Sequence, residues 1–412
     1  MPKKILILGG GFGGVRFYKT LHDLTHDSGD YLFQVVNRWN YFLFYPMLHE
    51  VATGSVDRSH ITQPLREIMN CCLETFYHTD AEHIDFKNKQ VKTAQGMLIY
   101  DFLCVGLGAT GNFFGVKGAA EHTLQLKDIA SAIALRNTII ARFEAATKSA
   151  DADERKKLLH FVIVGGGSTG VELAGQLADV VFHEFKNLYQ EIDYHEVKIT
   201  LIQGGDRLIP QCVLPACKMA VVRLAQQGVA VQLNAVAKEI TASAVYLADG
   251  NILKTKTVMW TAGVASPLRG MVDDEYLNES GYFKTRDTLQ LVGHDEVFIA
   301  GDNAGVENGK GTRAPQTAQA AVGEGHVAAL NCFALMSNKP LKPFSFKSKG
   351  DIMPIGDWYA VAQFGSFVFG GRFAWWLRRT IFLTEMWSWM NRLKIVADWT
   401  LNIFMPRDTS QL

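Results

Sequence analysis

Two stretches of the chain repeat the same pattern of apolar residues followed by glycines. Residues 4–8 (KILIL) form a short apolar run that leads into GGGFGG at 9–14, and a helical pattern follows. Residues 160–164 (HFVIV) lead in the same way into GGGSTG at 165–170 and the amphipathic stretch VELAGQLADVVFHEF. A continuous apolar run is typical of a strand buried on both faces of a parallel sheet. The repeat therefore predicts two strand–turn–helix units, and not a solenoid of many copies.

The glycine spacing in both units is G-x-G-x-x-G, which indicates dinucleotide binding where it joins a strand to a helix. The first glycine permits a tight turn, the second lets the backbone approach a pyrophosphate, and the third lets helix and strand pack closely. The helix N-terminus adds free N–H groups and a partial positive charge. The candidate binding residues are Gly9, Gly11, Phe12, Gly13 and Gly14 in the first unit and Gly165, Gly167 and Gly170 in the second.

The pattern changes beyond about residue 340. Before it, short apolar runs alternate with helical stretches, and the charged segment SADADERKK at 149–157 predicts a solvated linker into the second unit. After it, we expect short strands near 352–369 and two aromatic-rich helices at about 372–390 and 392–404. The predicted fold class is α/β, with two Rossmann-like dinucleotide-binding domains and a C-terminal amphipathic helical region.

An acidic residue usually ends the second strand of such a unit and binds a ribose. Here Asn37 ends the strand at 33–36 and Gln203 ends the strand at 200–202. An amide still bonds a ribose hydroxyl but does not repel a 2′-phosphate, a repulsion of about 4 kcal/mol between unit charges 4 Å apart at an effective dielectric of 20. We therefore expect Gln203 to permit both NADH and NADPH.

The overall composition is that of a neutral chain of several domains. It has 412 residues, with 41 Lys and Arg against 41 Asp and Glu, which argues against a nucleic-acid partner. The uncharged stretch at 358–371 has only 14 residues, whereas a membrane-spanning helix needs about 20. No secretory signal is evident at the N-terminus, and the six cysteines lack regular spacing, so we expect a reducing compartment.

The C-terminal region departs from this average. Six of the eight tryptophans lie between residues 358 and 399, and residues 372–412 carry six basic and three acidic side chains. On a continuous helix, Trp376, Leu383, Trp387 and Met390 would share one face, with Arg378, Arg379 and Arg392 flanking it. An aromatic face with basic borders is typical of a membrane interface. A core-packing or dimerisation helix is the alternative, and the two are compatible in a homodimer, which we expect.

Several longer motifs make the chain resemble the type II NADH dehydrogenases, the single-chain, non-proton-pumping NADH:quinone oxidoreductases. The resemblance spans nearly the whole chain. FYPMLHEVATG at 44–54 and PQTAQAA at 315–321 point to this family in particular. The other segments that carry it are GGGFGG at 9–14, YDFLCVGLGATGNFFGVKG at 100–118, FVIVGGGSTGVELAG at 161–175, VMWTAGV at 258–264 and FIAGDNA at 298–304.

The resemblance implies that the first unit binds FAD and the second binds NAD(P)H. It implies four segments: residues 1–113 and 281–340 for FAD, 114–280 for NAD(P)H, and 341–412 for membrane association. Asp302 would accept a hydrogen bond from the flavin ribitol, and Glu172 would face the nicotinamide and relay protons. Gln319 would contact the flavin or quinone, although the family's second Gln, four residues on, is Gly323 here. The remaining cofactor contacts implied are Asn37, Arg38, Gly108, Ala318, Gln203 and Gly263.

The cysteines argue against a redox dithiol and against a metal site. Cys212 and Cys217 lie in the second unit, away from the segment in which disulfide reductases carry their pair. Cys71 and Cys72 with His78 and His83 resemble zinc ligands, but adjacent cysteines do not easily close a tetrahedral site. We therefore expect no metal, and direct electron transfer from the flavin to a membrane quinone.

The expected location is peripheral, on the cytoplasmic face of the cell membrane. Two alternatives remain open at this point. A sulfide:quinone or ferredoxin-type reductase shares the architecture, and the former would need cysteines such as Cys104 or Cys332 at the flavin. A flavin- and NAD-binding signalling protein would hold a long-lived reduced flavin instead.

Overall fold

The computed structural model describes residues 2–306, 313–401, 407 and 410–411. Contacts between Cα atoms divide the chain into two compact units. The first unit consists of Met1–Leu43, Thr62–Thr110 and Val264–Lys349, and the second of Phe44–Ile61, Gly111–Gly263 and Gly350–Leu412. The short strands β10 (Thr110–Gly111) and β19 (Val264–Ala265) lie where the chain passes from one unit to the other.

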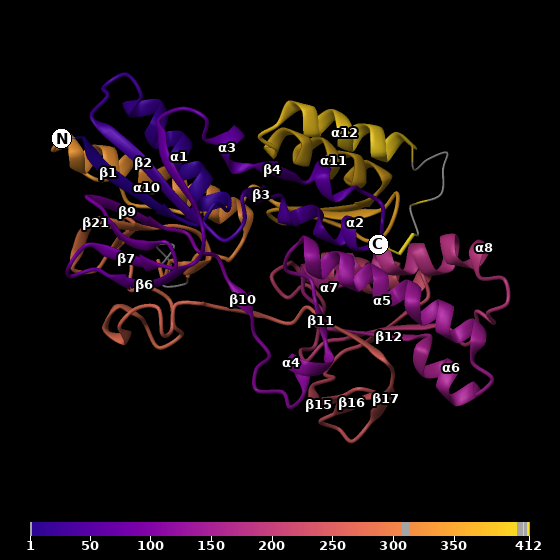
Figure 1. Ribbon diagram of the computed structural model, residues 1–412. Helices are drawn as coiled ribbons and strands as arrows, with labels where there is room; N and C mark the ends of the chain where they lie inside the picture. Colours follow the sequence, from indigo (N-terminus) through magenta and orange to yellow (C-terminus); the bar gives the residue numbers. More distant parts are fainter. Residues whose placement is uncertain (1, 307–312, 402–406, 408–409, 412) are drawn as a thin grey trace. The chain divides into compact units, whose positions relative to one another are not determined.

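A six-stranded sheet forms the centre of the first unit. All neighbouring strands are parallel except β20, which pairs antiparallel with β21. Helices α1 (Phe12–Thr25) and α10 (Ala318–Met336) lie side by side (Figure 1). The order of the strands is β20 (Gln290–Leu291), β21 (His294–Ile299), β9 (Phe102–Val105), β1 (Lys3–Leu8), β2 (Tyr31–Asn37) and β5 (Leu73–His78).

Smaller elements complete the first unit. They are the antiparallel strands β3 (Tyr41–Leu43) and β4 (Thr62–Pro64), helix α3 (Leu65–Ile68), the antiparallel sheet β6 (Ala81–Asp85), β7 (Gln90–Thr93) and β8 (Gly96–Ile99), and the 3-10 turns η4 (Asp274–Tyr276) and η5 (Gly301–Asn303).

The second unit is built around a five-stranded sheet in which every neighbouring pair is parallel. Its strand order is β11 (Leu124–Gln125), β18 (Thr257–Trp260), β12 (His160–Val164), β13 (Lys198–Ile202) and β14 (Val229–Gln232). Helix α7 (Ser168–Asp179) follows β12 and continues into the π-helical turn η3 (Val180–Phe185). All five residues of β12 are buried, as a strand covered on both faces requires.

The other elements of the second unit surround this sheet. They are η1 (Tyr45–Met47), α2 (Leu48–Ala52), η2 (Arg58–His60), α4 (Ala119–His122), α5 (Ile129–Lys148), α6 (Ala152–Leu158), α8 (Lys186–Leu188), α9 (Leu214–Gln226) and the antiparallel sheet β15 (Ala237–Thr241), β16 (Ala244–Leu247) and β17 (Ile252–Lys254).

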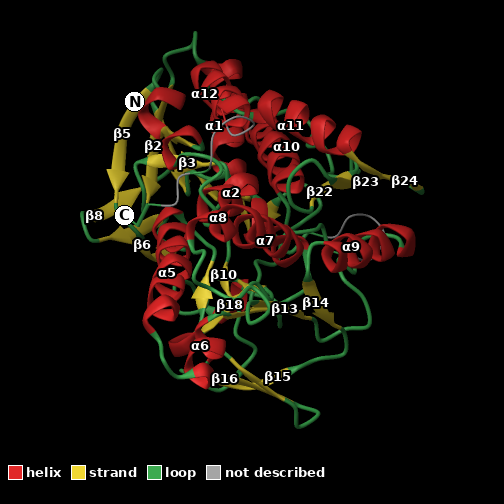
Figure 2. Cartoon of the chain, turned by 90° about the vertical axis from the view of Figure 1, so that its right-hand side faces the viewer, coloured by secondary structure: helices red, strands yellow, loops and turns green. Residues whose placement is uncertain are grey.

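The C-terminal region packs within the second unit. An antiparallel sheet, β22 (Asp351–Pro354), β23 (Ala360–Phe364) and β24 (Phe367–Gly371), precedes α11 (Arg372–Glu385) and α12 (Trp389–Leu401). The two helices lie next to each other (Figure 2), and the Arg379 guanidinium of α11 stacks over the Trp399 ring of α12 at 4.2 Å. Within the described part of the chain, no helix is long and apolar enough to cross a membrane.

One expectation about these helices is wrong. α11 ends at Glu385 and Met386 is extended, so Trp387 lies between the helices and cannot share a continuous face with Trp376. Arg378 does not border a membrane face either, because it is only 2% exposed and pairs with a buried carboxylate. Residues 402–404 of the expected second helix lie outside the described residues.

The predicted fold class is confirmed, because each of the two large sheets contains a strand that leads through a glycine turn into a helix. The four expected segments stay a prediction, because compactness says nothing of which ligand a segment binds. Their boundaries differ from the compact units chiefly in three places: residues 44–61 and 350–412 belong to the second unit, and residues 264–280 belong to the first.

Candidate functional site

The first glycine turn, between β1 and α1, has the shape of a phosphate cradle. Gly9 has φ +102°, and a Cβ there would lie 2.1 Å from the Gly106 carbonyl oxygen. A Cβ at Gly14 would lie 1.9 Å from the Gly9 oxygen, so helix and strand touch through this glycine. At Gly11 a Cβ would meet nothing within 4 Å. The middle glycine thus leaves open space at the helix N-terminus, where a pyrophosphate is expected to bind.

The second turn, between β12 and α7, repeats this geometry. Gly165 has φ +112°, and a Cβ at Gly170 would lie 1.9 Å from its carbonyl oxygen. Around Gly167 nothing lies within 4 Å of a Cβ. In both turns the first glycine makes the tight bend, the second leaves open space, and the third packs closely against the strand. Both turns therefore fit a dinucleotide pyrophosphate.

The amides at the ends of the second strands have a role that the sequence did not reveal. The Asn37 side-chain oxygen accepts a hydrogen bond from the Gly10 backbone N–H at 2.8 Å, and Gln203 accepts one from Gly166 at 2.9 Å. Each amide thus fixes the glycine turn of its own unit. The nitrogen of Asn37 donates to the Trp39 carbonyl at 2.6 Å.

The turn that carries Asp302 is held by a buried carboxyl group. Glu324 of α10 is 2% exposed, and its Oε2 accepts a hydrogen bond from the Gly301 N–H at 2.6 Å. Burial, with a smaller contribution from Asp302, raises the pKa of Glu324 to about 8. Arg313 donates to the Asp302 carbonyl oxygen at 2.8 Å, so the backbone of this turn is anchored from both sides.

The start of α10 carries Ala318 and Gln319, and Gly323 follows about one turn later. Ala318 is its first residue, and the Thr317 side chain caps the helix. Gln319 is exposed, and its Oε1 accepts a hydrogen bond from the Lys349 N–H at 3.2 Å. A Cβ at Gly323 would lie 3.3 Å from the Phe344 ring, so a side chain there would require the ring to move by a few tenths of an ångström.

The remaining expected contacts lie in structured turns. Gly108 has φ +71°, and its N–H and carbonyl are both bonded by the side chain of the fully buried Asn303. Gly263 has φ +69° beside the Phe114 ring. Arg38 forms an exposed ion pair with Asp80 at 2.8 Å.

Glu172, on the first turn of α7, lies in a buried group of charged side chains in the second unit. Its Oε2 is 3.6 Å from Nδ1 of His49 in α2. Burial raises the pKa of Glu172 to about 7, with Glu50 adding to the effect and Arg378 opposing it. The same carboxyl group can therefore be protonated or ionised close to neutral pH.

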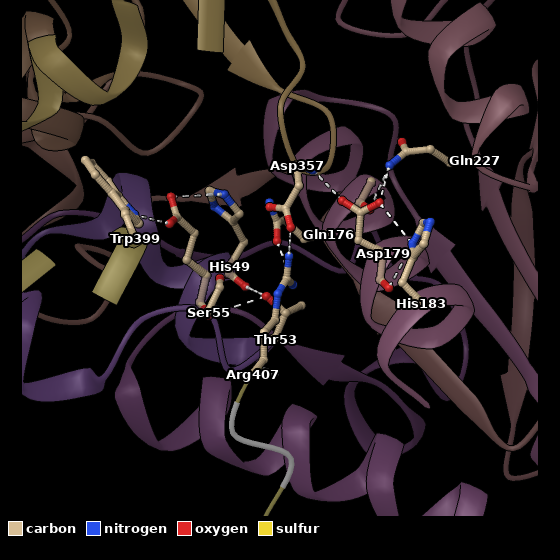
Figure 3. Close-up of polar contacts among 12 residues, drawn as sticks. His49, Thr53, Ser55, Gln176, Asp179, His183, Gln227, Asp357, Trp399 and Arg407 are labelled. Carbon is tan, nitrogen blue, oxygen red and sulfur yellow. Dashed lines mark hydrogen bonds and ion pairs between the residues drawn. The ribbon is translucent and has the colours of Figure 1, made fainter. Parts of the chain in front are cut away.

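His49 lies between two carboxyl groups. Its Nε2 is 3.9 Å from Oε1 of Glu50 and has no hydrogen-bond partner. Burial, and then Arg378, lower the pKa of His49 to about 3, so the imidazole is neutral. Figure 3 shows His49 and Trp399 pointing toward the same place, where the Trp399 indole N–H donates to Glu50 Oε2 at 3.2 Å.

Glu50 forms a buried ion pair with Arg378 of α11. The Arg378 guanidinium donates to Glu50 Oε1 at 3.1 Å and to the Pro46 carbonyl at 3.0 Å. Burial alone would raise the pKa of Glu50, but the positive charges of Arg378 and, to a smaller extent, Arg379 outweigh it and the pKa is lowered. An ionised Glu50 therefore connects the segment at 44–61 to the C-terminal helices.

A second buried network lies further along α7. Arg407 donates to Gln176 at 3.1 Å and pairs with Asp357, and the Asp357 N–H donates to Asp179 (Figure 3). Burial and the charge of Asp357 raise the pKa of Asp179 to about 6. Arg407 opposes this rise, as do the hydrogen bonds that Asp179 accepts from the Asp357 N–H and from Gln227. A Cβ at Gly175 would lie 2.5 Å from the Gly356 nitrogen, so this face of α7 packs directly against the turn after β22.

The six cysteines are all free, and four of them are buried. Burial raises the pKa of the Cys104 and Cys332 thiols, so neither is poised as a thiolate. Cys212 and Cys217 are buried in the second unit, and burial raises the pKa of Cys212 to about 12.

Sequence reasoning missed His49, Glu50 and Glu324 as site residues. A signal existed for the first two, because a His–Glu pair inside the apolar run MLHEVA must be buried with partners. Glu324 stands similarly alone in the small, apolar stretch AQAAVGEGHVAAL. Their partners come from distant parts of the chain and could not be identified from spacing.

The chain matches the family described as pyridine nucleotide-disulphide oxidoreductase over residues 3–325. It is 30% identical over 391 residues to the type II NADH:quinone oxidoreductase of Haemophilus influenzae, covering 88% of this chain and 87% of that protein. It is 29% identical to the type II NADH:quinone oxidoreductase Ndh of Mycobacterium tuberculosis, covering 98% and 89%. Its fold matches NDH2 from Plasmodium falciparum in complex with NADH, with a TM-score of 0.89 over the full length of both chains and 21% identity.

Proposed function

This chain belongs to the type II NADH:quinone oxidoreductases, within the pyridine nucleotide-disulphide oxidoreductase family, and from that premise we propose how its residues serve electron transfer from NADH through FAD to a membrane quinone. The observation that carries the proposal is Glu172. It is a largely buried carboxyl group, with its side chain 15% exposed and a pKa of about 7, on the helix that begins at the second glycine cradle. Quinone reduction consumes two protons, and this group can hold one at neutral pH.

The first unit fits FAD. Gly11 leaves the space that a pyrophosphate needs, Asn37 fixes the turn, and Glu324 and Arg313 hold the backbone at Asp302 in place. Bound FAD supplies the chemistry that no side chain can, accepting a hydride from NADH and passing the electron pair to the quinone. The residues of the unit bind and orient it, with Gln319 and Ala318 at the exposed start of α10.

The second unit fits the nicotinamide dinucleotide. Gly167 is open to the pyrophosphate, and Gln203 supports the turn where many such units place an acid. An amide at this position does not repel a 2′-phosphate, so NADH is used and NADPH is also accepted. Glu172 orients the nicotinamide from the first turn of α7.

Proton supply runs through the buried group around Glu172. Protonated Glu172 donates to the reduced quinone oxygen, and neutral His49 lies beside it at 3.6 Å. That distance and the 3.9 Å to Glu50 are longer than hydrogen bonds, and a small rotation or one water molecule would complete the contacts. Glu50 stays ionised against Arg378, and its negative charge helps to keep the proton on Glu172.

Membrane attachment uses the outer surface of the C-terminal helices. Trp389, Leu393 and Val396 follow one another at i, i+4 and i+7 on α12 and are 66%, 55% and 41% exposed. Phe373 and Trp376 on α11 are 72% and 49% exposed. Such an apolar surface is typical of helices that lie in a membrane interface. The proposed arrangement is a peripheral homodimer on the cytoplasmic face of the membrane, in a respiratory chain.

Anaerobic stopped-flow with the purified, flavin-containing protein tests this function. NADH is expected to reduce the flavin rapidly, and a short-chain quinone mixed in afterwards is expected to reoxidise it faster than oxygen does. Slow reoxidation by quinone would contradict the proposal. A long-lived reduced complex would instead favour a signalling protein, and bleaching of the flavin by sulfide that Cys104→Ser abolishes would favour a sulfide oxidoreductase.

A further inference from the structure

Three potential metal ligands meet in the first unit, on helix α1 and just before strand β5. A nitrogen of His22 and the thiols of Cys71 and Cys72 all lie within 4.8 Å of one another. The two sulfur atoms are 3.4 Å apart. His78 and His83, the histidines that follow the cysteines along the sequence, are not part of this group. The third ligand comes instead from helix α1, about fifty residues earlier in the chain.

The backbone at the two cysteines is fixed from both sides. The Tyr18 hydroxyl of α1 donates to the Cys71 carbonyl, and the Cys72 carbonyl accepts from the Phe33 N–H of β2 at 3.4 Å. Tyr18 and His22 are one helical turn apart, with their rings stacked at 5.6 Å between centroids. The helix that positions His22 is thus the helix that anchors the cysteines.

His22 is oriented as a ligand would be. Its Nε2 is buried without a hydrogen-bond partner, while its Nδ1 lies 3.6 Å from the Asp23 carboxylate. A carboxylate at one ring nitrogen favours the proton there and leaves the lone pair on the other. In metal-binding histidines the second ring N–H commonly donates to a carboxylate, and the Asp23 carboxylate lies just beyond hydrogen-bond distance for that contact.

The internal repeat shows which of these features the fold itself requires. Cys72 comes just before Leu73, which pairs with Phe33, and Gly228 comes just before Val229, which pairs with Ile199 at the same place in the second sheet. Both residues have positive φ, +60° at Cys72 and +83° at Gly228. Glycine adopts this conformation freely, whereas a side chain costs roughly 1–3 kcal/mol.

The helix differs between the repeats at the matching positions. His22 lies eight residues after Gly14, and the residue eight after Gly170 is Ala178. The first unit therefore carries a histidine where the second has alanine and a cysteine where the second has glycine. Both differences converge on one place, which a purely structural role does not explain.

We propose that His22, Cys71 and Cys72 form a binding site for a thiophilic divalent cation, with Zn²⁺ as the best-matched ion. Two thiolates and one imidazole are ligands that zinc prefers, and three protein ligands leave a fourth position for water. The left-handed backbone of Cys72 accompanies the close approach of the two thiols, which answers the objection that adjacent cysteines do not close a tetrahedral site. On binding, each thiol releases its proton to solvent as its sulfur bonds to the metal.

Metal titration of the flavin-containing protein tests the proposal. The cysteine thiols are first reduced, bound metal is removed with a chelator, and the flavin is left oxidised. Zn²⁺ is expected to bind with one ion per chain in competition with a chromogenic chelator. Co²⁺ is expected to produce ligand-field absorption in the red, where oxidised flavin is nearly transparent. Cys71→Ser/Cys72→Ser is expected to lose both signals, and His22→Ala to weaken binding at least about tenfold.

Two controls separate this site from non-specific binding. The double variant Cys212→Ser/Cys217→Ser also removes two thiols, but from the second unit. His26→Ala removes the histidine that follows His22 in the chain. Both control variants are expected to bind the metal as the parent does. Cys72→Gly is expected to lose the metal while the melting temperature of the metal-free protein rises slightly, because the strain is relieved. Equal binding by the parent and the Cys71/Cys72 variant, or loss of binding in either control, would overturn the proposal.

Discussion

The two glycine cradles are built alike, and they differ in what packs beside their helices. In each, the first glycine turns, the second is open, the third touches the strand, and an amide from the second strand holds the turn. The position two residues after the third glycine is Arg16 in the first unit and Glu172 in the second. The same backbone therefore presents opposite charges at equivalent places.

The two helices also have different neighbours. A Cβ at Gly325 of α10 would lie 2.3 Å from the Gly13 oxygen of α1, so α10 packs closely on the first helix and delivers Glu324 to the Asp302 turn. In the second unit, α2 brings His49 and Glu50 to α7, and α11 supplies Arg378 to Glu50. The two cradles thus share their backbone geometry, and the groups packed beside each helix differ.

The largest expected effect comes from breaking the ion pair of the second unit. Arg378→Ala leaves Glu50 buried without its charged partner, and we expect the free energy of unfolding to fall by about 3–5 kcal/mol. Arg372→Ala, which alters an exposed arginine on the same helix, is expected to change it by no more than about 0.5 kcal/mol. Urea denaturation followed by tryptophan fluorescence measures both. Equal effects of the two variants would show that the buried pair does not support this unit.

Blocking the open glycines separates the two cradles by ligand. Gly11→Val is expected to yield protein that purifies without flavin. Gly167→Val is expected to keep the flavin and to raise KM for NADH by about 100-fold, or about 2.7 kcal/mol. Flavin absorbance and steady-state kinetics give both results. Loss of flavin from the Gly167 variant would contradict the assignment of ligands to units.

The buried carboxyl group of the first unit predicts a dependence of stability on pH. The pKa of Glu324 is raised to about 8, so the native state keeps a proton that the unfolded chain releases above the ordinary value of 4.5. Its contribution to stability is full below that value and is lost as pH rises through about 8. Glu324→Gln keeps the acceptor for Gly301 and is expected to make the decline shallower. Glu279→Gln, an exposed change in the same unit, should leave the decline intact, and an unchanged slope in the Glu324 variant would refute the assignment.

The smallest expected effect concerns the choice of nicotinamide cofactor. The parent is expected to prefer NADH over NADPH by less than about 100-fold in kcat/KM, because Gln203 carries no charge. Gln203→Glu should increase that preference by about tenfold. Asn37→Asp places the same new charge in the other cradle and should leave the preference unchanged. A parent preference well above 100-fold would defeat this explanation of Gln203.

Both cradles, the α/β architecture and the two C-terminal helices were predictable from the sequence, because they depend on local patterns. The apolar run before each glycine turn and the spacing within it determine the strand, turn and helix. Periodicity located the C-terminal helices but not their break at Met386 or the burial of Arg378. A helical face can be inferred from spacing alone. The burial of Arg378 depends instead on its ion pair with Glu50, which lies more than three hundred residues earlier in the chain.

The candidate site was predictable only where a motif carried it. Glu172 follows a glycine motif at a fixed distance, so its place on the first turn of α7 could be foreseen. His49, Glu50 and Glu324 depend on contacts between distant segments. The group of His22, Cys71 and Cys72 depends in addition on the backbone conformation of one residue. Neither kind of information is present in residue spacing.

The central claim, that Glu172 supplies a proton to the quinone, is tested most directly by double-mixing stopped-flow across pH with Glu172→Gln. We expect flavin reduction by NADH to remain within a few-fold of the parent and reoxidation by quinone to slow by about 100-fold. In the parent, reoxidation should decline as pH rises through about 7, because the protonated form of Glu172 is lost. Asp179→Asn, a second buried acid on the same helix, should keep that profile. Reoxidation of the Glu172 variant at the parent's rate, with the parent's pH dependence, would contradict the account.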